Sequence, residues 1–201
     1  MAPKTSSRSL HLANSPEANE LLARDPFALL AGMLLDQQVP MDWAFTGPYT
    51  LTQRLGTVDL DPAHIASYDD EKFIALAAQR PAIHRYPGSM AKRVQALARY
   101  IVESYDGDAA AIWTGAADGA ELLRRLQALP GFGEQKAKIF LALLGKQLGV
   151  TPEGWRKAAG VYGEEGSTRS IADVTSAESL AAVRAYKQKV KAKAKATAAA
   201  R

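Results

Sequence analysis

Apolar residues recur at intervals of three and four positions along nearly the whole chain, which is the pattern of amphipathic helices. Phe27, Leu30 and Leu34 are one example of this spacing. Strictly alternating stretches are scarce, and the one candidate strand, at 9–13, has no hairpin signal beside it. The pattern predicts a compact all-α protein whose helices are joined by short connections rich in Gly, Pro and Asp.

Capping residues place the ends of these helices. Ser15 is expected to cap a helix that begins with Pro16 and runs to about Arg24, and Asp25 with Pro26 starts the next helix. Further helices are expected at 41–55, 61–67, 70–79, 89–105, 118–126, 134–148, 152–159 and 176 to about 191.

Length and composition restrict the classes of protein that remain. A chain of 201 residues that is 47% hydrophobic can bury a core as one domain or as two small lobes around a cleft. Cysteine is absent from the sequence, which excludes disulfides, thiolate zinc sites and thiolate-bound iron–sulfur clusters. No apolar run approaches the length of a membrane span, so we expect no membrane partner and a cytoplasmic, nucleoid-associated protein.

Positive charge is concentrated at the C-terminus. The formal net charge is +4, yet six positive charges and no negative ones follow Tyr186, so the rest of the chain is near −2. We therefore divide the chain into an N-terminal segment (1–14), a globular part (15–186) and a basic Lys/Ala tail (187–201). The tail lacks an apolar face and is expected to be a frayed helix or a disordered arm. It is either a solubilising end or an arm that grips DNA without sequence preference.

A tight glycine-containing turn, Pro130-Gly131-Phe132-Gly133, directly precedes a strongly periodic helix. The glycines permit backbone conformations closed to other residues, and they leave the first N–H groups of the helix uncovered. Those amides lie at the positive end of the helix dipole, where an anion such as a phosphate is favoured, and Lys136 and Lys138 add charge. The alternative is an αα-hairpin in which glycine serves only to turn the chain.

Three segments resemble the helix-hairpin-helix (HhH-GPD) superfamily of DNA glycosylases. They are "LPGFGEQKAKIFLALLG" at 129–145, "LLAGMLLDQQVPMDWAF" at 29–45 and "YPGSMAKRVQALARYI" at 86–101, in the family's order and spacing. The resemblance covers about residues 20–160. It implies a two-lobed helical bundle around a cleft, which binds double-stranded DNA and acts in base excision repair.

The resemblance also implies roles for the hairpin and for other polar residues. Hairpin carbonyls would hold a monovalent or hard cation that bridges to a DNA phosphate, and amides of the two glycines would meet that phosphate. The matching carbonyls belong to Gln127, Leu129 and Phe132, and the amides to Gly131 and Gly133. No other cofactor is implied.

Side chains that reach into or along the DNA are expected from three further segments. Gln37 and Gln38 match the residues that fill the gap left by an extruded base, although a glutamine pair is otherwise only a polar helix end. Lys92 and Arg93 are candidates for contacts with the DNA backbone. Trp155 and Trp43, with Tyr162, are candidates for stacking on the extruded base, although such aromatics more often belong to a core.

The chain departs from the family pattern at its catalytic positions. Gln135 occupies the place of the Schiff-base lysine of bifunctional relatives, and an amide cannot form an imine, so we expect no lyase activity. Lys136 is expected to point about 100° around the helix, away from the cleft.

The family's catalytic aspartate corresponds by spacing to Glu153, which we expect in the first turn of a helix capped by Thr151. Glutamate is also favoured there for helix stability alone. Asp36 and Asp173 are alternatives of lower rank. Together these features predict a monomeric, monofunctional DNA glycosylase that hydrolyses the N-glycosidic bond of a flipped, damaged or mispaired base. A catalytically inactive protein that binds distorted DNA and a helical protein-interaction module are the alternatives.

Overall fold

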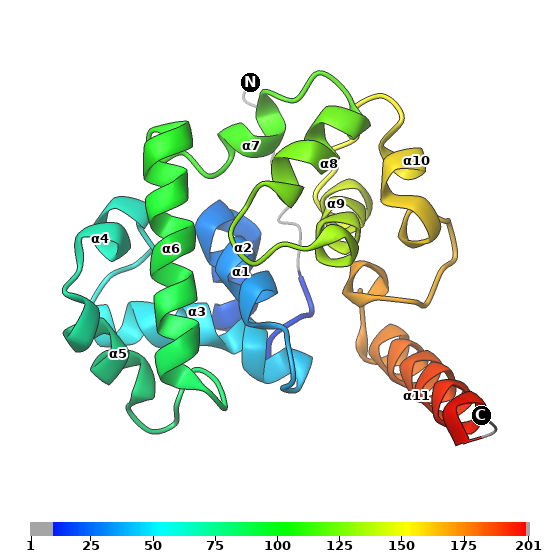
Figure 1. Ribbon diagram of the computed structural model, residues 1–201, viewed down its shortest axis with the longest axis horizontal. Helices are drawn as coiled ribbons and strands as arrows, with labels where there is room; N and C mark the ends of the chain where they lie inside the picture. The colour runs from blue at the N-terminus through cyan, green and yellow to red at the C-terminus, as the bar shows by residue number, and fades with distance from the viewer. Residues whose placement is uncertain (1–9, 200–201) are drawn as a thin grey trace.

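The computed structural model describes residues 10–199, and the side chains of residues 10–193, and all regular structure in this part is helical (Figure 1). The predicted all-α class is therefore confirmed. The strand expected at 9–13 does not form in its described part, and Ser9 lies outside the described residues. The backbone N–H groups of Leu12 and Ala13 instead donate to the side-chain oxygen of Asn19 (both 2.9 Å), so this segment needs no partner strand.

The first six helices pack together around α2 and α6, on the left of Figure 1. They are α1 (Pro16–Arg24), α2 (Pro26–Leu35), α3 (Met41–Leu55), α4 (Pro62–Ser67), α5 (Asp70–Ala78) and α6 (Pro87–Tyr105). Helix α3 packs along α2, while α4 and α5 pack against α6. Every residue of α2 after Pro26 is buried, as expected of a helix that is apolar on all sides.

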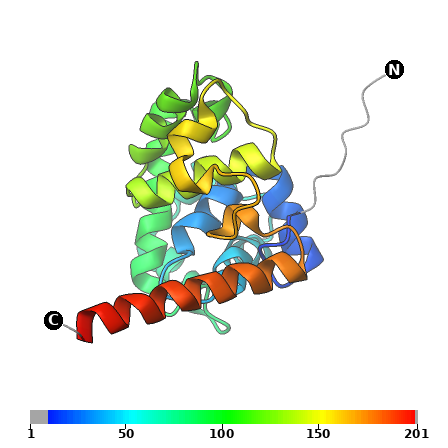
Figure 2. The ribbon, with the colours of Figure 1, turned by 90° about the vertical axis from the view of Figure 1, so that its right-hand side faces the viewer.

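The later helices form a second group, which includes the glycine hairpin. They are α7 (Ala111–Thr114), α8 (Gly119–Gln127), α9 (Glu134–Gln147), α10 (Trp155–Ala159) and the 3-10 helices η1 (Gly160–Tyr162) and η2 (Ile171–Asp173). Helix α10 packs on both α8 and α9, and η2 packs on α9. The last helix, α11 (Ala177–Ala199), contacts η2 and runs as a long rod past the body of the protein (Figure 2).

Local capping explains why most helix starts agree with the sequence to within one or two residues. The Ser15 hydroxyl accepts the N–H of Ala18 (3.2 Å) at the start of α1. Asp25 is buried and accepts two backbone N–H groups, from Ala28 (2.9 Å) in α2 and from Leu60 (2.7 Å). Such bonds satisfy donors that a helix N-terminus leaves free.

Two expectations about the C-terminal third are corrected. Helix α10 begins at Trp155 after Gly154, which has φ +70°, so Thr151 is not its cap and Glu153 is not in its first turn. The Pro152 carbonyl accepts the N–H of Trp155 (3.1 Å) in a turn before the helix. The basic tail is helical as far as Ala199, well beyond the expected end near residue 191, whereas the tail residues 200–201 lie outside the described part.

Candidate active site at the end of α2

The glycine turn between α8 and α9 is packed against α2. Gly131 has φ +84°, and a Cβ at this position would overlap the Leu34 side chain. Phe132 is buried, with its ring edge-to-face with Phe140 (5.8 Å between centroids), and its N–H donates to the Leu129 carbonyl (3.0 Å). The Phe132 side chain therefore anchors the hairpin in the core. Because this side chain is buried, Phe132 could contact DNA only through its backbone.

The start of α9 is bare. Gly133 is the N-cap residue, is exposed, has no side-chain capping bond, and has nothing within 4 Å of where a Cβ would lie. Lys138 is next to this end but its ammonium pairs with Glu134 (2.6 Å) on the exposed face of the same helix. The arrangement leaves backbone amides of the first turn open to an anion from solvent.

Lys136 points toward the end of α2, contrary to the expectation that it faces away. Its ammonium donates to the carbonyls of Met33 (2.5 Å), Leu34 (3.2 Å) and Asp36 (3.4 Å), which end α2 and lack helical partners. The expectation was wrong because α2 lies on the Lys136 side of α9. Burial lowers the pKa of Lys136 to about 8, and the Asp36 carboxylate opposes this shift.

Asp36 directly follows Leu35 and is the C-cap residue of α2. It lies at the centre of a tight turn with φ −71° and ψ 72°, closed by a bond from the N–H of Gln37 to the Leu35 carbonyl (2.7 Å). Its half-buried carboxylate makes no hydrogen bond or ion pair with any residue of the part that the structure describes. Burial raises the pKa of Asp36, and the positive charges of Lys187 and Lys136 partly counteract that rise.

The Asp36 carboxylate lies in the lining of a pocket of about 600 Å³. Residues 36–39 after α2 form one wall and the first turns of α9 form a second. The rest of the lining is Met33 of α2, Val161 and Tyr162 of η1, Arg169, and Tyr186, Lys187, Val190 and Lys191 of α11. The Gln135 amide donates to the Tyr162 hydroxyl (2.8 Å) inside this lining. The volume is in the range of small-molecule sites, about 300–1,000 Å³.

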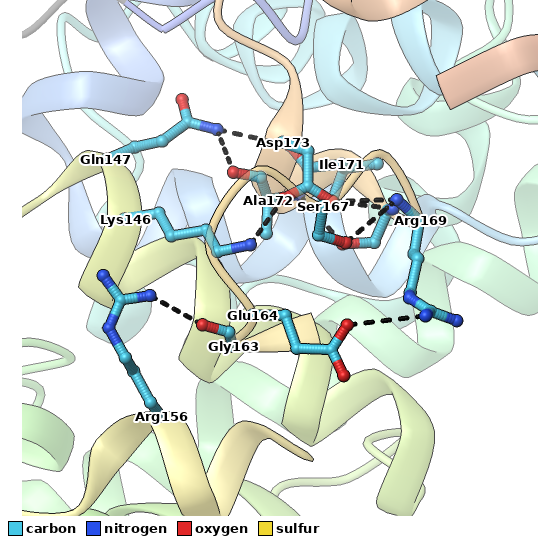
Figure 3. A network of polar contacts seen from close by, with 11 residues as sticks. Lys146, Gln147, Arg156, Gly163, Glu164, Ser167, Arg169, Ile171, Ala172 and Asp173 are labelled. Carbon is cyan, nitrogen blue, oxygen red and sulfur yellow. Dashed lines mark hydrogen bonds and ion pairs between the residues drawn. The ribbon is translucent and has the colours of Figure 1, made fainter. Parts of the chain in front are cut away.

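A polar network fixes the loop that carries Arg169 to the pocket (Figure 3). The buried Asp173 carboxylate pairs with the Lys146 ammonium (2.5 Å) and accepts the N–H groups of Arg169 (3.0 Å) and Ser170 (3.1 Å). The Gln147 amide donates to the Ala172 carbonyl (2.9 Å). Asp173 is thus fully engaged in positioning the loop, and the structure gives no support for its use as a catalytic carboxylate.

The two glutamines differ in how they are held. Gln37 donates to the Leu34 carbonyl (2.7 Å) and accepts from the Arg93 guanidinium (3.3 Å). The backbone carbonyl of Gln37 is 2.9 Å from Nε2 of the buried His84. Because Nδ1 of His84 accepts the Tyr86 N–H, the ring proton is on Nε2, which donates to this carbonyl. Gln38 is exposed and has φ +60°, an uncommon conformation for a residue with a Cβ. Gln38 is therefore the free side chain at the rim.

The remaining predicted site residues lie away from the pocket. Glu153 is exposed, and its carbonyl accepts the Gly119 N–H (2.7 Å) at the start of α8, the opposite end of the hairpin from Gly131. Trp155 is buried against Gly145, where a Cβ would overlap its ring. Both residues are outside the pocket lining.

Trp43 on α3 is also outside the lining, and its indole N–H donates to the Ala82 carbonyl (2.8 Å). Lys92 is exposed on α6. Of the three aromatic residues expected to stack on the base, only Tyr162 lines the pocket. Tyr186 also lines it, although no sequence pattern indicates a role for this residue. Tyr186 reaches the site because α11 lies beside it, which no local pattern reveals.

Carboxylate, histidine and cysteine groups suited to a metal ion are absent from the part of the chain that the structure describes. Likewise, none of the described helices has the length and apolarity needed to span a bilayer. Comparison of the chain with protein-family models, with curated proteins and with solved structures finds no match.

Proposed function

We propose that this protein is a monofunctional DNA glycosylase of base excision repair, of the HhH-GPD type, that binds duplex DNA as a monomer. It would hydrolyse the N-glycosidic bond of a damaged or mispaired base turned out into the pocket between α2, α9 and α11. The observation that carries the proposal is the unpaired Asp36 carboxylate in a pocket next to a bare, glycine-capped helix start.

The DNA backbone would meet the start of α9. Amides beyond Gly133 and the helix dipole favour a phosphate there, whereas the Lys138 ammonium is already paired with Glu134. The carbonyls of Gln127, at the end of α8, and of Leu129 and Phe132, in the turn that follows, would hold a monovalent or hard cation that neutralises the same phosphate; the Leu129 carbonyl would do so while it also accepts the Phe132 N–H (3.0 Å). Lys92 and Arg93 would extend the contact along the duplex.

The pocket supplies the features that base extrusion needs. Tyr162 and Tyr186 line the pocket, and an extruded base would pack against them, while Gln38 at the rim would enter the gap that the base leaves. Turning out a base costs about a few kcal/mol, and least for a damaged or mispaired one. Part of the selectivity for lesions therefore comes from the DNA.

Asp36 would perform the chemistry. An ionised carboxylate in a partly desolvated site stabilises the positive charge that develops on the sugar and accepts a proton from the attacking water. The Lys136 ammonium is held by three carbonyls, and Gln135 stands where relatives carry the imine-forming lysine. Hydrolysis without strand cleavage by a lyase step is the expected outcome.

The test compares Asp36→Asn with Glu153→Gln on duplexes that contain uracil, hypoxanthine, oxidised guanine, alkylated purines or an abasic site. Hot alkali would reveal released bases as strand breaks. We expect Asp36→Asn to lower the single-turnover rate by roughly 100-fold or more while DNA affinity is retained, and Glu153→Gln to match the wild type. Loss of activity in Glu153→Gln alone would transfer the catalytic role to that residue. Intact strands throughout, with binding retained, would favour the catalytically inactive DNA-binding protein.

A further inference from the structure

The pocket carries more positive charge than its one carboxylate can balance. Its lining contains one acidic residue, Asp36, and four basic residues, which are Lys136, Arg169, Lys187 and Lys191. Glu164, outside the lining, is paired with Arg169 (3.4 Å) on the exposed side of the loop. The charge inside the pocket is therefore net positive.

These cations come from separate walls. Lys136 enters from α9 and is held by the carbonyls at the end of α2. Arg169 comes from the anchored loop, and its guanidinium donates to the Tyr186 hydroxyl (3.1 Å). Lys187 comes from α11, the rod seen along the bottom of Figure 2, and acts electrostatically on Asp36. A base bound between the walls would be approached by positive charge from more than one side.

We propose that this pocket selects uncharged lesions, namely deaminated or oxidised bases, over alkylated purines that already carry a positive charge. The inference rests on the proposed glycosylase function and concerns its substrate class. It follows from which charge develops on the base when the bond to the sugar breaks.

In the reaction the C1′–N bond breaks and its electron pair stays on the base nitrogen. The oxygen of a water molecule bonds to C1′, one water proton passes to the Asp36 carboxylate, and the departing base later takes a proton from solvent. A neutral base leaves as an anion, which the surrounding cations stabilise in the transition state. A cationic N7-alkylated purine leaves as a neutral molecule, so the cations give no help to its departure and repel it when it binds.

The experiment measures single-turnover base release, with protein in excess, from four duplexes. Three contain a neutral lesion (uracil opposite guanine, hypoxanthine opposite thymine, 8-oxoguanine opposite cytosine) and one contains 7-methylguanine, with spontaneous loss subtracted. Lys187→Gln is compared with Lys189→Gln, which removes the same charge from the same helix at an exposed residue outside the pocket lining.

We expect release of at least one neutral base and no enzymatic release of 7-methylguanine. Lys187→Gln should slow the release of the neutral base roughly three- to tenfold, since one of the positive charges that line the pocket is lost. Lys189→Gln should remain within about twofold of the wild type, because Lys189, although exposed like Lys187, does not line the pocket, and solvent between it and the base screens its charge.

Two results would overturn the substrate class while leaving the glycosylase proposal intact. One is release of 7-methylguanine as fast as any neutral base, and the other is an equal effect of the two lysine substitutions. If no base is released from any duplex although the protein binds DNA, the glycosylase function itself fails and the inference fails with it.

Discussion

At the scale of single residues, the end of α2 determines what the site can do. Asp36 ends the helix in a tight turn, and the next two residues turn away into the rim of the pocket. Gln37 is fixed by Arg93 and His84, whereas Gln38 is exposed in a left-handed conformation. That conformation costs about 1–2 kcal/mol for a residue with a Cβ. A strained, free side chain at the mouth of a pocket is typical of a residue kept for function.

Gln38→Gly should therefore separate stability from function. Glycine adopts the left-handed conformation without strain, so the free energy of unfolding should be unchanged or raised by up to about 1 kcal/mol. Base release should fall roughly tenfold, because no side chain would fill the gap that the extruded base leaves in the DNA duplex. Chemical denaturation measures the effect on stability, and single-turnover assays measure the effect on base release. Asp106→Gly, at an exposed left-handed position that ends α6, is the control and should leave base release unaltered. Full activity in Gln38→Gly would remove this side chain from the mechanism.

At the scale of elements, the α8–α9 hairpin uses its two glycines for different purposes. Gly131 is required by its positive φ and by the close approach of Leu34, so its role is to pack the turn on α2. Gly133 has an extended conformation that any residue adopts, and its surroundings are empty. A Cβ at Gly133 would meet no protein atom within 4 Å, so the bare position leaves room for a phosphate to approach.

The two positions should respond differently to alanine. Gly131→Ala should lower the free energy of unfolding by about 1–3 kcal/mol through strain and overlap with Leu34. Gly133→Ala should change stability by less than about 0.5 kcal/mol, yet weaken binding to all duplexes alike, because a phosphate contact carries no sequence information. Denaturation curves and fluorescence anisotropy with lesion-bearing and undamaged duplexes measure both. Were Gly133→Ala to alter lesion preference instead, the bare helix start would belong to the base pocket.

At the scale of the whole molecule, the site is assembled from segments far apart in sequence. The Lys136 ammonium reaches the carbonyl of Asp36 across 100 positions, and Lys187 acts on the same residue from the last helix. The pKa values of Asp36 and Lys136, the two groups closest to the proposed chemistry, are shifted in opposite directions. Burial raises the pKa of Asp36 above the ordinary value of 3.8 and lowers that of Lys136 from 10.5 to about 8.

Base release should accordingly depend on pH with a maximum. Below the raised pKa of Asp36 its carboxyl is protonated and cannot accept a proton from water, so the rate falls as pH decreases. Above about 8 Lys136 loses the charge that favours an anionic leaving base, so the rate falls again as pH increases. Lys136→Met should be slow throughout and should lack the upper limb, provided that its melting curve shows a folded protein. An unchanged upper limb in that variant would assign it to another group.

The sequence by itself determined the helical class, most helix ends and the position of the glycine hairpin. These features depend on interactions within about four residues, such as the bonds of Ser15 and Asp25 to the first turns of α1 and α2. At Glu153 a favoured Thr-Pro-Glu helix start was overridden by longer-range packing, because the chain turns at Gly154 and buries Trp155 against α9.

Only the tertiary structure decided which polar residues share a pocket. The direction of Lys136 depended on which side of α9 faces α2, and the presence of Tyr186 and Lys187 depended on where α11 lies. Spacing along one helix cannot reveal the orientation of another element packed against it. The carboxylate at the centre of the site, Asp36, is for the same reason recognised by its unpaired, half-buried position and not by its distance from the hairpin in sequence.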